Sequence, residues 1–379
     1  MPDLVCFCHL RWDFVYQRPQ HLLSRYAKVQ RVFVIEEPLF HNDGPTLQII
    51  EKASNLVVVV PMLPHGHSFQ EIEQMQKDLL NIFFVEKQIE KYIFLYFTPM
   101  ALGISDHFKP LVTIYDCMDE LAAFKYAPPE LIPRENQLLA KADVVFTGGH
   151  NLYQAKKNSH QNIHPFPSSI DKEHFSKART IKYEPADQQS IPHPRFGFYG
   201  VVDERFDLDL ISNVAKMRPD WHFVIIGPVV KIDPESLPNE NNIHYLGGKE
   251  YSDLPEYLAT WDVAIIPFLR NESTRYISPT KTPEYLAAGK PVISTSIIDV
   301  IRPYGDLNLV HIADTPEKFI LAAETELMST DKSSWLEKVD EHLQHNSWDI
   351  TWDRMMNLIS NKLEGPKHHI SNQNLEAYV

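Results

Sequence analysis

The sequence is poor in cysteine and has no long apolar run. It contains three cysteines in 379 residues, too few for a disulfide framework. Cys6 and Cys8 lie two positions apart in an apolar run, and no His or Cys stands near them at metal-site spacing. We therefore expect buried free thiols, which suit a reducing cytosol. No window approaches the roughly 20 apolar residues of a membrane-spanning helix, and the N-terminus MPDLVCFCHL lacks the basic region of a signal peptide.

Positive charge is also in short supply. Lys and Arg number 36 against 50 Asp and Glu, and the formal net charge is −14. This balance argues against a general nucleic-acid-binding protein. No basic amphipathic helix that would lie on a membrane surface is evident. We expect a cytoplasmic protein, with weak peripheral contact at the inner membrane face as an alternative.

Glycine is absent where a dinucleotide-binding fold would need it. The first apolar run, residues 4–8, is followed by HLRWDFVYQRPQHLLSRYAK (9–28), which contains no glycine. The Gly-x-Gly-x-x-Gly fingerprint of such folds needs three glycines at this place. A Rossmann dehydrogenase is therefore only a distant alternative.

Short apolar runs alternate with longer amphipathic segments along the whole chain. Examples are RVFVIE (31–36), LVTIYD (111–116), HFVIIG (222–227) and DVAIIPF (262–268). Near-continuous apolar runs are typical of parallel strands buried on both faces, and helical stretches between them indicate βαβ units. The sequence therefore predicts an α/β fold with doubly wound parallel sheets.

A polar segment with three prolines divides the chain. Residues 176–194 read as a linker, which gives one Rossmann-like domain at 1–175 and a second at 195–346. A helix is expected at 347–364 and a flexible tail at 365–379. Two such domains imply a cleft, and ligands gather at the carboxyl ends of the strands that face it.

The segment SPTKTPEYLAAGKPVIST (278–295) predicts a short helix that follows a strand and a loop. Thr280 or Thr282 is placed to cap the helix, and Pro283 falls in its first turn. Gly289 suits the left-handed position after the helix. A helix start of this kind has free N–H groups that attract phosphate.

Two charged side chains of this helix suit a nucleotide. Lys281 adds a positive charge at the helix start, and Glu284 lies about one turn in, where a carboxylate can accept hydrogen bonds from a ribose diol. The plain alternative is a solvated lysine and a glutamate favoured by the helix dipole.

Two further segments of the second half supply donor-site candidates. RFGFYGVVDERFDLDLI (195–211) gives a strand, a turn at Gly200 and a charged cluster in which Arg205 can contact phosphate with two nitrogens. An ordinary charge cluster at a helix start is the alternative. Gly227 ends the next strand, and a nucleobase could lie against the backbone near Leu246 and Gly247, where a plain turn is the alternative.

The run from IHYLGG to SPTKTPEYLAAGKPVIST resembles the donor-binding half of GT-B glycosyltransferases, especially the large retaining group that includes family 4. Glu284 matches the second glutamate of that family's paired motif, which holds the ribose hydroxyls, and AAGKPVIS matches the family's residues after that glutamate. The first glutamate, which contacts the sugar, is replaced here by Tyr276. The resemblance implies two Rossmann-like domains that face a cleft. The donor-site residues it favours are Gly200, Asp203, Arg205, Gly227, Leu246, Gly247, Tyr276, Ser278, Thr280, Lys281 and Glu284.

The string WDF-x-Y-Q-R-P-Q-H-L-L-S-R in the first half resembles the N-terminal signature of bacterial glycosyltransferases for exopolysaccharide and cell-surface sugars. The resemblance implies that the first domain binds the acceptor and that the helix at 347–364 returns to complete this domain. The acceptor-side candidates are Trp12, Asp13, Gln17, Arg18 and His21. Positions on a helix surface are the alternative for about half of them.

Four residues are candidates for chemistry. Asp116 and Asp119 follow a strand at the expected cleft, as carboxylates that face the anomeric centre or the acceptor hydroxyl. Helix capping is the alternative for Asp119. Arg205 and Lys281 would stabilise the charge that develops on the leaving diphosphate.

The sequence therefore predicts a glycosyltransferase of the hexosyltransferase kind that works in surface polysaccharide synthesis. It would move a sugar from a UDP- or GDP-sugar to a hydroxyl of a saccharide or lipid-linked saccharide. No convincing Asp-x-Asp loop is present, so metal independence and no cofactor beyond the co-substrate are expected, and the resemblance implies retention of configuration. The alternatives are a nucleotide-sugar epimerase of the same fold and a non-catalytic partner of another transferase.

Overall fold

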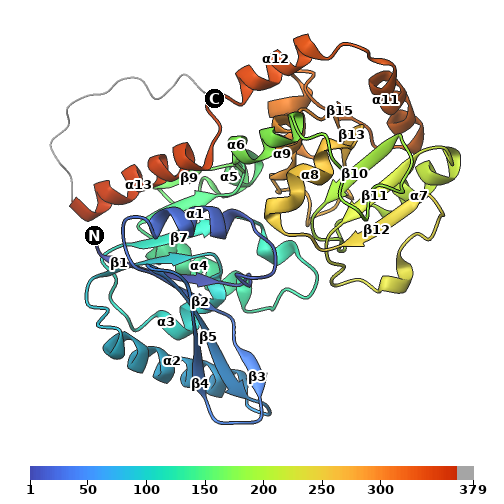
Figure 1. Cartoon of the computed structure of the whole chain (residues 1–379). Coiled ribbons are helices and arrows are strands. Elements are labelled where there is room, and N and C mark those ends of the chain that lie inside the picture. The colour runs from blue at the N-terminus through green and yellow to red at the C-terminus, as the bar shows by residue number, and fades with distance from the viewer. Residues whose placement is uncertain (365–379) are drawn as a thin grey trace, which may run out of the picture.

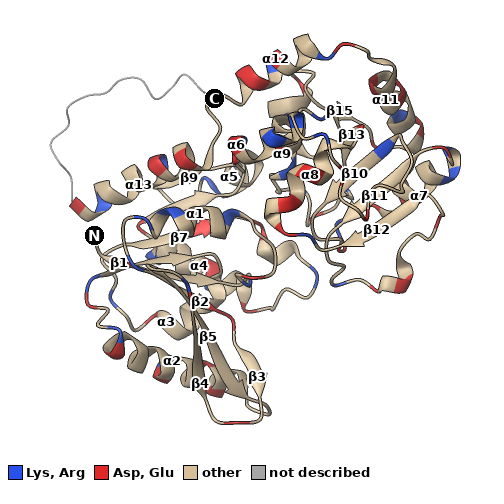
Figure 2. Ribbon diagram, viewed as in Figure 1, with Lys and Arg blue, Asp and Glu red and all other residues tan. Residues whose placement is uncertain are grey.

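The computed structural model of the chain describes residues 1–364, and the tail predicted at 365–379 lies outside this part. The chain forms two sheets with helices on both sides of them (Figure 1). The charged residues are spread over both halves rather than gathered on one element (Figure 2). No described helix has the length and apolar character to cross a bilayer.

The first sheet has nine strands in the order β3-β5-β2-β1-β6-β7-β8-β9, with β4 paired to β5. Every pairing is parallel except that of β4 with β5. The strands are β1 Asp3–Cys8, β2 Val32–Glu36, β3 Leu39–His41, β4 Thr46–Ala53, β5 Leu56–Pro64, β6 Tyr92–Tyr96, β7 Thr113–Cys117, β8 Val144–Thr147 and β9 Ile163–Pro165.

The second sheet has six strands in the order β12-β11-β10-β13-β14-β15, all parallel. The near-continuous apolar runs of the sequence form most strands of both sheets, and the side chains of the central strands are buried because helices cover both faces. The strands are β10 Arg195–Tyr199, β11 His222–Ile226, β12 Ile243–Gly247, β13 Val263–Ile266, β14 Val292–Ser294 and β15 His311–Ile312.

Helices follow most strands and connect them in βαβ order. They are α1 Arg18–Tyr26, α2 Phe69–Glu86, α3 Leu102–Ser105, α4 Leu131–Lys141, α5 His150–Lys156, α6 Lys172–Ser176, α7 Leu208–Met217, α8 Leu254–Ala259, α9 Lys281–Ala287, α10 Ile298–Val300, α11 Pro316–Met328, α12 Ser333–His342 and α13 Trp348–Glu364. Cys6, Cys8 and Cys117 are free and buried, as predicted.

The last helix, α13, packs against the first sheet rather than the second. Trp348, Met355 and Ile359 are fully buried in the same core cluster as the strands of that sheet. The two chain segments that pass between the sheets are bonded to each other at this point. The backbone N–H of Trp348 donates to the Ile170 carbonyl at 3.1 Å, and the Ser169 hydroxyl donates to Asn346 at 2.6 Å.

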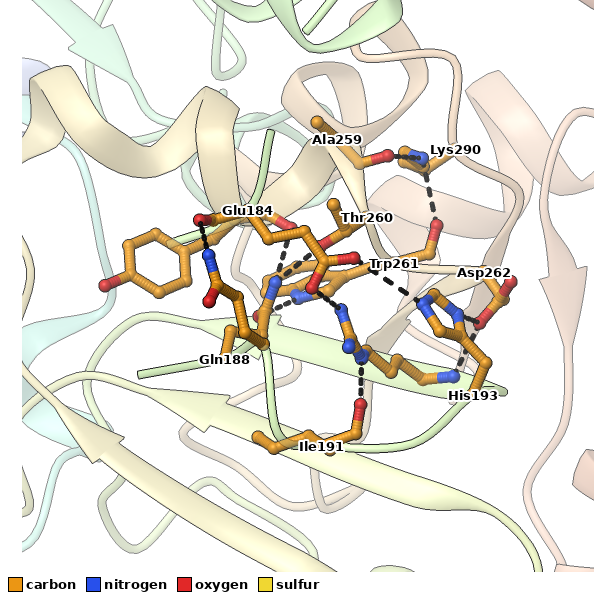
Figure 3. Close-up of polar contacts among 12 residues, drawn as sticks. Glu184, Gln188, Ile191, His193, Ala259, Thr260, Trp261, Asp262 and Lys290 are labelled. Carbon is orange, nitrogen blue, oxygen red and sulfur yellow. Dashed lines mark hydrogen bonds and ion pairs between the residues drawn. The ribbon is translucent and has the colours of Figure 1, made fainter. Parts of the chain in front are cut away.

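The polar segment at 176–194 is fixed against the second sheet's helices (Figure 3). Gln188 is fully buried, donates to the Thr260 hydroxyl and accepts from the Trp261 indole at 2.9 Å (Figure 3). His193 pairs with Asp262 at 2.7 Å. The polar composition that suggested a linker therefore serves specific hydrogen bonds, and the segment lies along the second domain as a strap.

Candidate active site

A cavity of about 520 Å³ is lined by loops from both sheets. The first domain contributes the loop 12–18 after β1 and the residues just after β7. The second contributes the ends of β10 and β11 and the start of α9. Most of the residues singled out from the sequence line it: Trp12, Asp13, Gln17, Arg18, Asp119, Gly200, Arg205, Gly227, Ser278, Thr280, Lys281 and Glu284.

Lys281 faces this cavity without a protein counter-ion. Within residues 1–364 its ammonium makes no hydrogen bond or ion pair, and it lies over the rings of Phe198 and Phe268 at 5.4 and 5.8 Å. A Cβ on Gly200 would come within 2.3 Å of the lysine stem, and the φ of +136° at Gly200 favours glycine for its backbone as well. Burial lowers the pKa of Lys281, although the nearby Glu284 opposes this shift. An anion in the cavity would supply the missing partner.

Glu284 lines the cavity one turn further along α9. Its carboxylate is 4% exposed and accepts a short hydrogen bond from the Tyr199 hydroxyl. Burial raises the pKa of Glu284, while the Tyr199 hydrogen bond and Lys281 lower it. A carboxylate held in this way can accept hydrogen bonds from a diol that enters the cavity.

The start of α9 offers fewer free donors than the sequence suggested. The N–H groups of Thr282 and Glu284 already donate to the carbonyls of Pro279 and Thr280, and Pro283 has no N–H. Neither threonine hydroxyl caps the helix, and that of Thr282 is buried without a partner. Side-chain cations therefore carry most of the positive charge at this end of the cavity.

Arg205 lines the cavity with one side of its guanidinium already neutralised. Its Nε and Nη2 donate to both oxygens of Asp203 at 2.6 to 3.1 Å, and it lies over the Phe124 ring of the first domain at 5.2 Å. Asp203 is 4% exposed and does not line the cavity. The structure thus corrects the prediction that Asp203 contacts the donor, because its carboxylate holds Arg205 instead.

Of the two carboxylates proposed for chemistry, only Asp119 reaches the cavity. Asp116 is completely buried and accepts from Arg18 Nε and Nη2 at 2.9 and 3.0 Å. Its predicted place beside the reacting centre is wrong, since both oxygens are taken by that guanidinium. Burial raises the pKa of Asp119 to about 6, and Arg205 and Arg18 limit the rise. A carboxyl group that titrates near neutral pH in a cleft is suited to proton transfer.

The acceptor-side candidates also divide into residues that line the cavity and a residue that does not. Trp12, Asp13, Gln17 and Arg18 line the cavity, and Lys52 of β4 holds Asp13 at 2.6 Å.

His21 does not line the cavity, which corrects its predicted contact with the acceptor. Its imidazole is buried, stacked on Trp348 with ring centroids 4.7 Å apart and in edge contact with Tyr16. Burial lowers the pKa of His21 to about 3. It is a core residue because α13 covers its side of α1.

Three donor candidates lie beside the cavity rather than in it. Tyr276 packs against the apolar core of the first domain. Leu246 and Gly247 end β12, and the cavity wall begins one residue later, at Gly248. The Gly247 carbonyl accepts from the N–H of Gly227, so this strand end supports the wall without forming it.

Sequence reasoning missed Tyr251, which lines the cavity. Its ring stacks on Tyr16 of the first domain and on His174, with centroids 4.5 Å apart in each case. The hydroxyl is buried without a partner. An aromatic residue three positions after the double glycine of LGGKEY was the signal that could have identified it.

Comparison with known proteins finds similarity to glycosyltransferases. Residues 193–328 match the family of glycosyl transferases group 1. The putative teichuronic acid biosynthesis glycosyltransferase TuaH of Bacillus subtilis is 24% identical over 268 residues, which span 64% of this chain and 65% of TuaH.

Two solved structures share the fold over nearly their whole length. Sucrose-phosphate synthase from Thermosynechococcus elongatus superposes with a TM-score of 0.68 at 13% identity, covering 95% of this chain and 99% of that one. A trehalose-6-phosphate synthase studied for glycosyl transfer with retention gives 0.65 at 12% identity, with 94% and 99% covered. The chain therefore has the GT-B fold, and its residues 193–328 match the model of the group 1 glycosyl transferases.

Proposed function

We propose that the protein transfers a sugar from a nucleoside diphosphate sugar to a hydroxyl of a saccharide or lipid-linked saccharide. The observation that carries this proposal is the partnerless ammonium of Lys281, which faces a cavity shared by both domains. A diphosphate would supply the missing charge, and Arg205 lies in the same wall with one edge of its guanidinium free of protein partners among the described residues. The match of residues 193–328 to a glycosyl transferase family supports the same reaction class.

The cavity residues have separate roles in this reaction. Lys281 and Arg205 stabilise the charge that develops on the leaving diphosphate. Glu284 accepts hydrogen bonds from the ribose. Asp119 faces the acceptor hydroxyl and accepts its proton as the new glycosidic bond forms and the bond to the diphosphate breaks. The loop at 12–18 binds the rest of the acceptor.

Three finer features belong to the proposal. Transfer with retention is supported by the fold shared with a synthase studied for that outcome. Independence of metal ions is supported by the two cations placed where a divalent ion would otherwise balance the diphosphate. Similarity to TuaH, named for teichuronic acid biosynthesis, supports a role in the synthesis of a cell-surface polysaccharide.

A thermal-shift screen against UDP-, GDP- and dTDP-sugars tests the donor site, because a ligand that binds the native state raises its melting temperature. We expect one nucleotide class to raise it in the wild type, equally with and without EDTA, and to lose most of its effect in Lys281→Met. No shift with any nucleotide sugar, or an undiminished shift in the variant, would contradict the donor assignment. Incubation of donor alone, followed by product analysis, separates transfer from an epimerase, which needs no acceptor.

One observation favours a second function, that of a non-catalytic partner. Tyr276 stands where the family's first glutamate would contact the sugar, and its side chain packs away from the cavity. Such a partner would bind nucleotide sugars in the thermal-shift screen and show no turnover, even with membrane extract as the source of acceptor.

A further inference from the structure

A second cavity, of about 330 Å³, lies wholly within the first domain. It is enclosed by the ends of β1 and β2, by β3, by α2 and α3, and by the short helical turn Pro99–Ala101. Most of its wall is apolar, formed by Phe7, Ile35, Phe40, Phe69, Met100 and Ile104 among others. The volume is at the lower end of the range seen for small-molecule sites.

Three polar side chains of this wall are paired within the protein, and the Glu37 carboxylate also lines the cavity. Glu36 accepts from Arg11 at 3.0 Å and from the N–H of Trp12 at 2.7 Å. Glu73 is paired with Arg134, and the amide of Gln76 donates to a carbonyl of its own helix. A ligand in this cavity would therefore meet hydrocarbon and ring faces. The carboxylates at its edge, with no unpaired cation lining the wall, would repel an anionic group.

This cavity lies at the topological switch point of the first sheet, where open α/β sheets commonly bind ligands. The chain runs from β1 out to β2 on one side, and returns to β6 on the other side of β1. The order of strands reverses there, and the loops after β1 and β6 diverge to leave a crevice. Cys8 at the end of β1 and Thr98 just after β6 both line the cavity.

One hydrogen bond links the apolar cavity to the active-site cavity through the loop after β1. Glu36, which lines the apolar cavity, holds the backbone of Trp12, which lines the active-site cavity. The loop after β1 therefore borders the active-site cavity and is bonded to a residue that lines the apolar cavity. Phe40 and Phe69, each more than 40% exposed, stand at its rim as an apolar entrance.

We propose that this cavity binds an uncharged aliphatic chain of the acceptor, so that the enzyme selects glycolipid-like acceptors over free sugars. This inference rests on the proposed function, since it names the class of acceptor for the same site. The chain occupies the cavity by apolar burial, while the saccharide head remains at the loop 12–18. Any phosphate of such an acceptor lies outside the cavity, away from the Glu36 and Glu73 carboxylates.

Calorimetric binding of alkyl glucosides to the full chain, without donor and below their micelle concentrations, tests the proposal. Methyl, butyl, hexyl and octyl glucoside should bind with affinity that rises about fourfold for each buried methylene, until the cavity is filled. Ile72→Trp places a large side chain in the cavity and should remove the dependence on chain length. Ile82→Trp lies on the same helix at a position that is 56% exposed, and it should bind all four ligands as the wild type does.

Three results would overturn the assignment. They are equal or undetectable binding of methyl and octyl glucoside, an unchanged dependence on chain length in Ile72→Trp, and tighter binding of hexyl phosphate than of hexyl glucoside. The nucleotide thermal shift, measured on the same preparations, confirms that the variants fold. If that shift is absent while alkyl glucosides bind, the proposed donor site fails and the apolar cavity stands.

Discussion

Two cations line the same cavity and are held in opposite ways. Arg18 is 4% exposed, and both oxygens of Asp116 bind its guanidinium. Lys281 has no carboxylate partner within residues 1–364 and is in contact with two aromatic faces. The paired cation is part of the framework that shapes the loop, whereas the other cation keeps its charge for a ligand. The comparison predicts that stability depends on the Arg18–Asp116 pair and that turnover depends on Lys281.

The largest effect should come from breaking the buried pair. Asp116→Ala leaves the Arg18 guanidinium buried and uncompensated, which costs about 3–5 kcal/mol of unfolding free energy. Urea denaturation followed by circular dichroism measures this loss. The double variant Arg18→Met with Asp116→Leu should recover most of it, because apolar replacement of a buried pair is often neutral. An unchanged midpoint in Asp116→Ala would show that the pair contributes nothing.

The next effect concerns Asp119 and pH. Burial raises its pKa to about 6 in the folded chain from an ordinary 3.8, so the folded state holds this proton more tightly than the unfolded state does. Wild-type stability relative to Asp119→Asn should therefore fall as pH rises from about 4 to about 6, by at most about 3 kcal/mol. Urea titrations of both proteins at pH 4 and pH 7 measure the difference. A constant difference across this range would mean that folding does not raise the pKa of Asp119.

Turnover is the quantity that Lys281 should change. A charged hydrogen bond made in the transition state contributes about 1.5–3 kcal/mol, so Lys281→Met should reduce the rate by about 10- to 150-fold with no loss of stability. Lys290 is the matched control, because its ammonium donates to the carbonyls of Ala259 and Trp261 (Figure 3). Lys290→Met should lower the melting temperature and leave the rate per folded molecule intact. If Lys290→Met lowered the rate and Lys281→Met lowered only the melting temperature, then Lys290 and not Lys281 would act in turnover.

The smallest effect should follow from a surface pair that borders the cavity. Lys52 holds Asp13 at 2.6 Å, and the Asp13 side chain is 67% exposed. Exposed pairs contribute at most about 1 kcal/mol, so Lys52→Ala should weaken acceptor binding by no more than about fivefold. Calorimetry with octyl glucoside measures the change. A larger loss would place Asp13 in direct contact with the sugar.

The sequence predicted those parts of the site whose geometry is local. Lys281 and Glu284 are three residues apart on one helix, so a single turn brings them into the same cavity. The parallel strands could also be predicted, because a continuous apolar run is a local pattern of a strand buried on both faces. Gly289 has the expected left-handed backbone, with φ +73°.

Two of the failures, at Asp116 and His21, depend on a partner that is distant in sequence. Asp116 was indistinguishable from Asp119 until Arg18, 98 residues away, was seen to occupy both of its oxygens. His21 became a core residue because Trp348 returns from the far end of the chain. No local pattern encodes such pairings, and a polar residue that is paired in the core looks the same in the sequence as one that binds a ligand.

The bond between the two passages that connect the domains has a consequence for motion. The segments at 166–176 and 343–348 meet where Trp348 and Asn346 bind Ile170 and Ser169. These hydrogen bonds fix the two interdomain connections to each other at one place. A change in the angle between the domains would therefore pivot at these bonds, and the strap at 176–194, which follows directly, would move with the second domain.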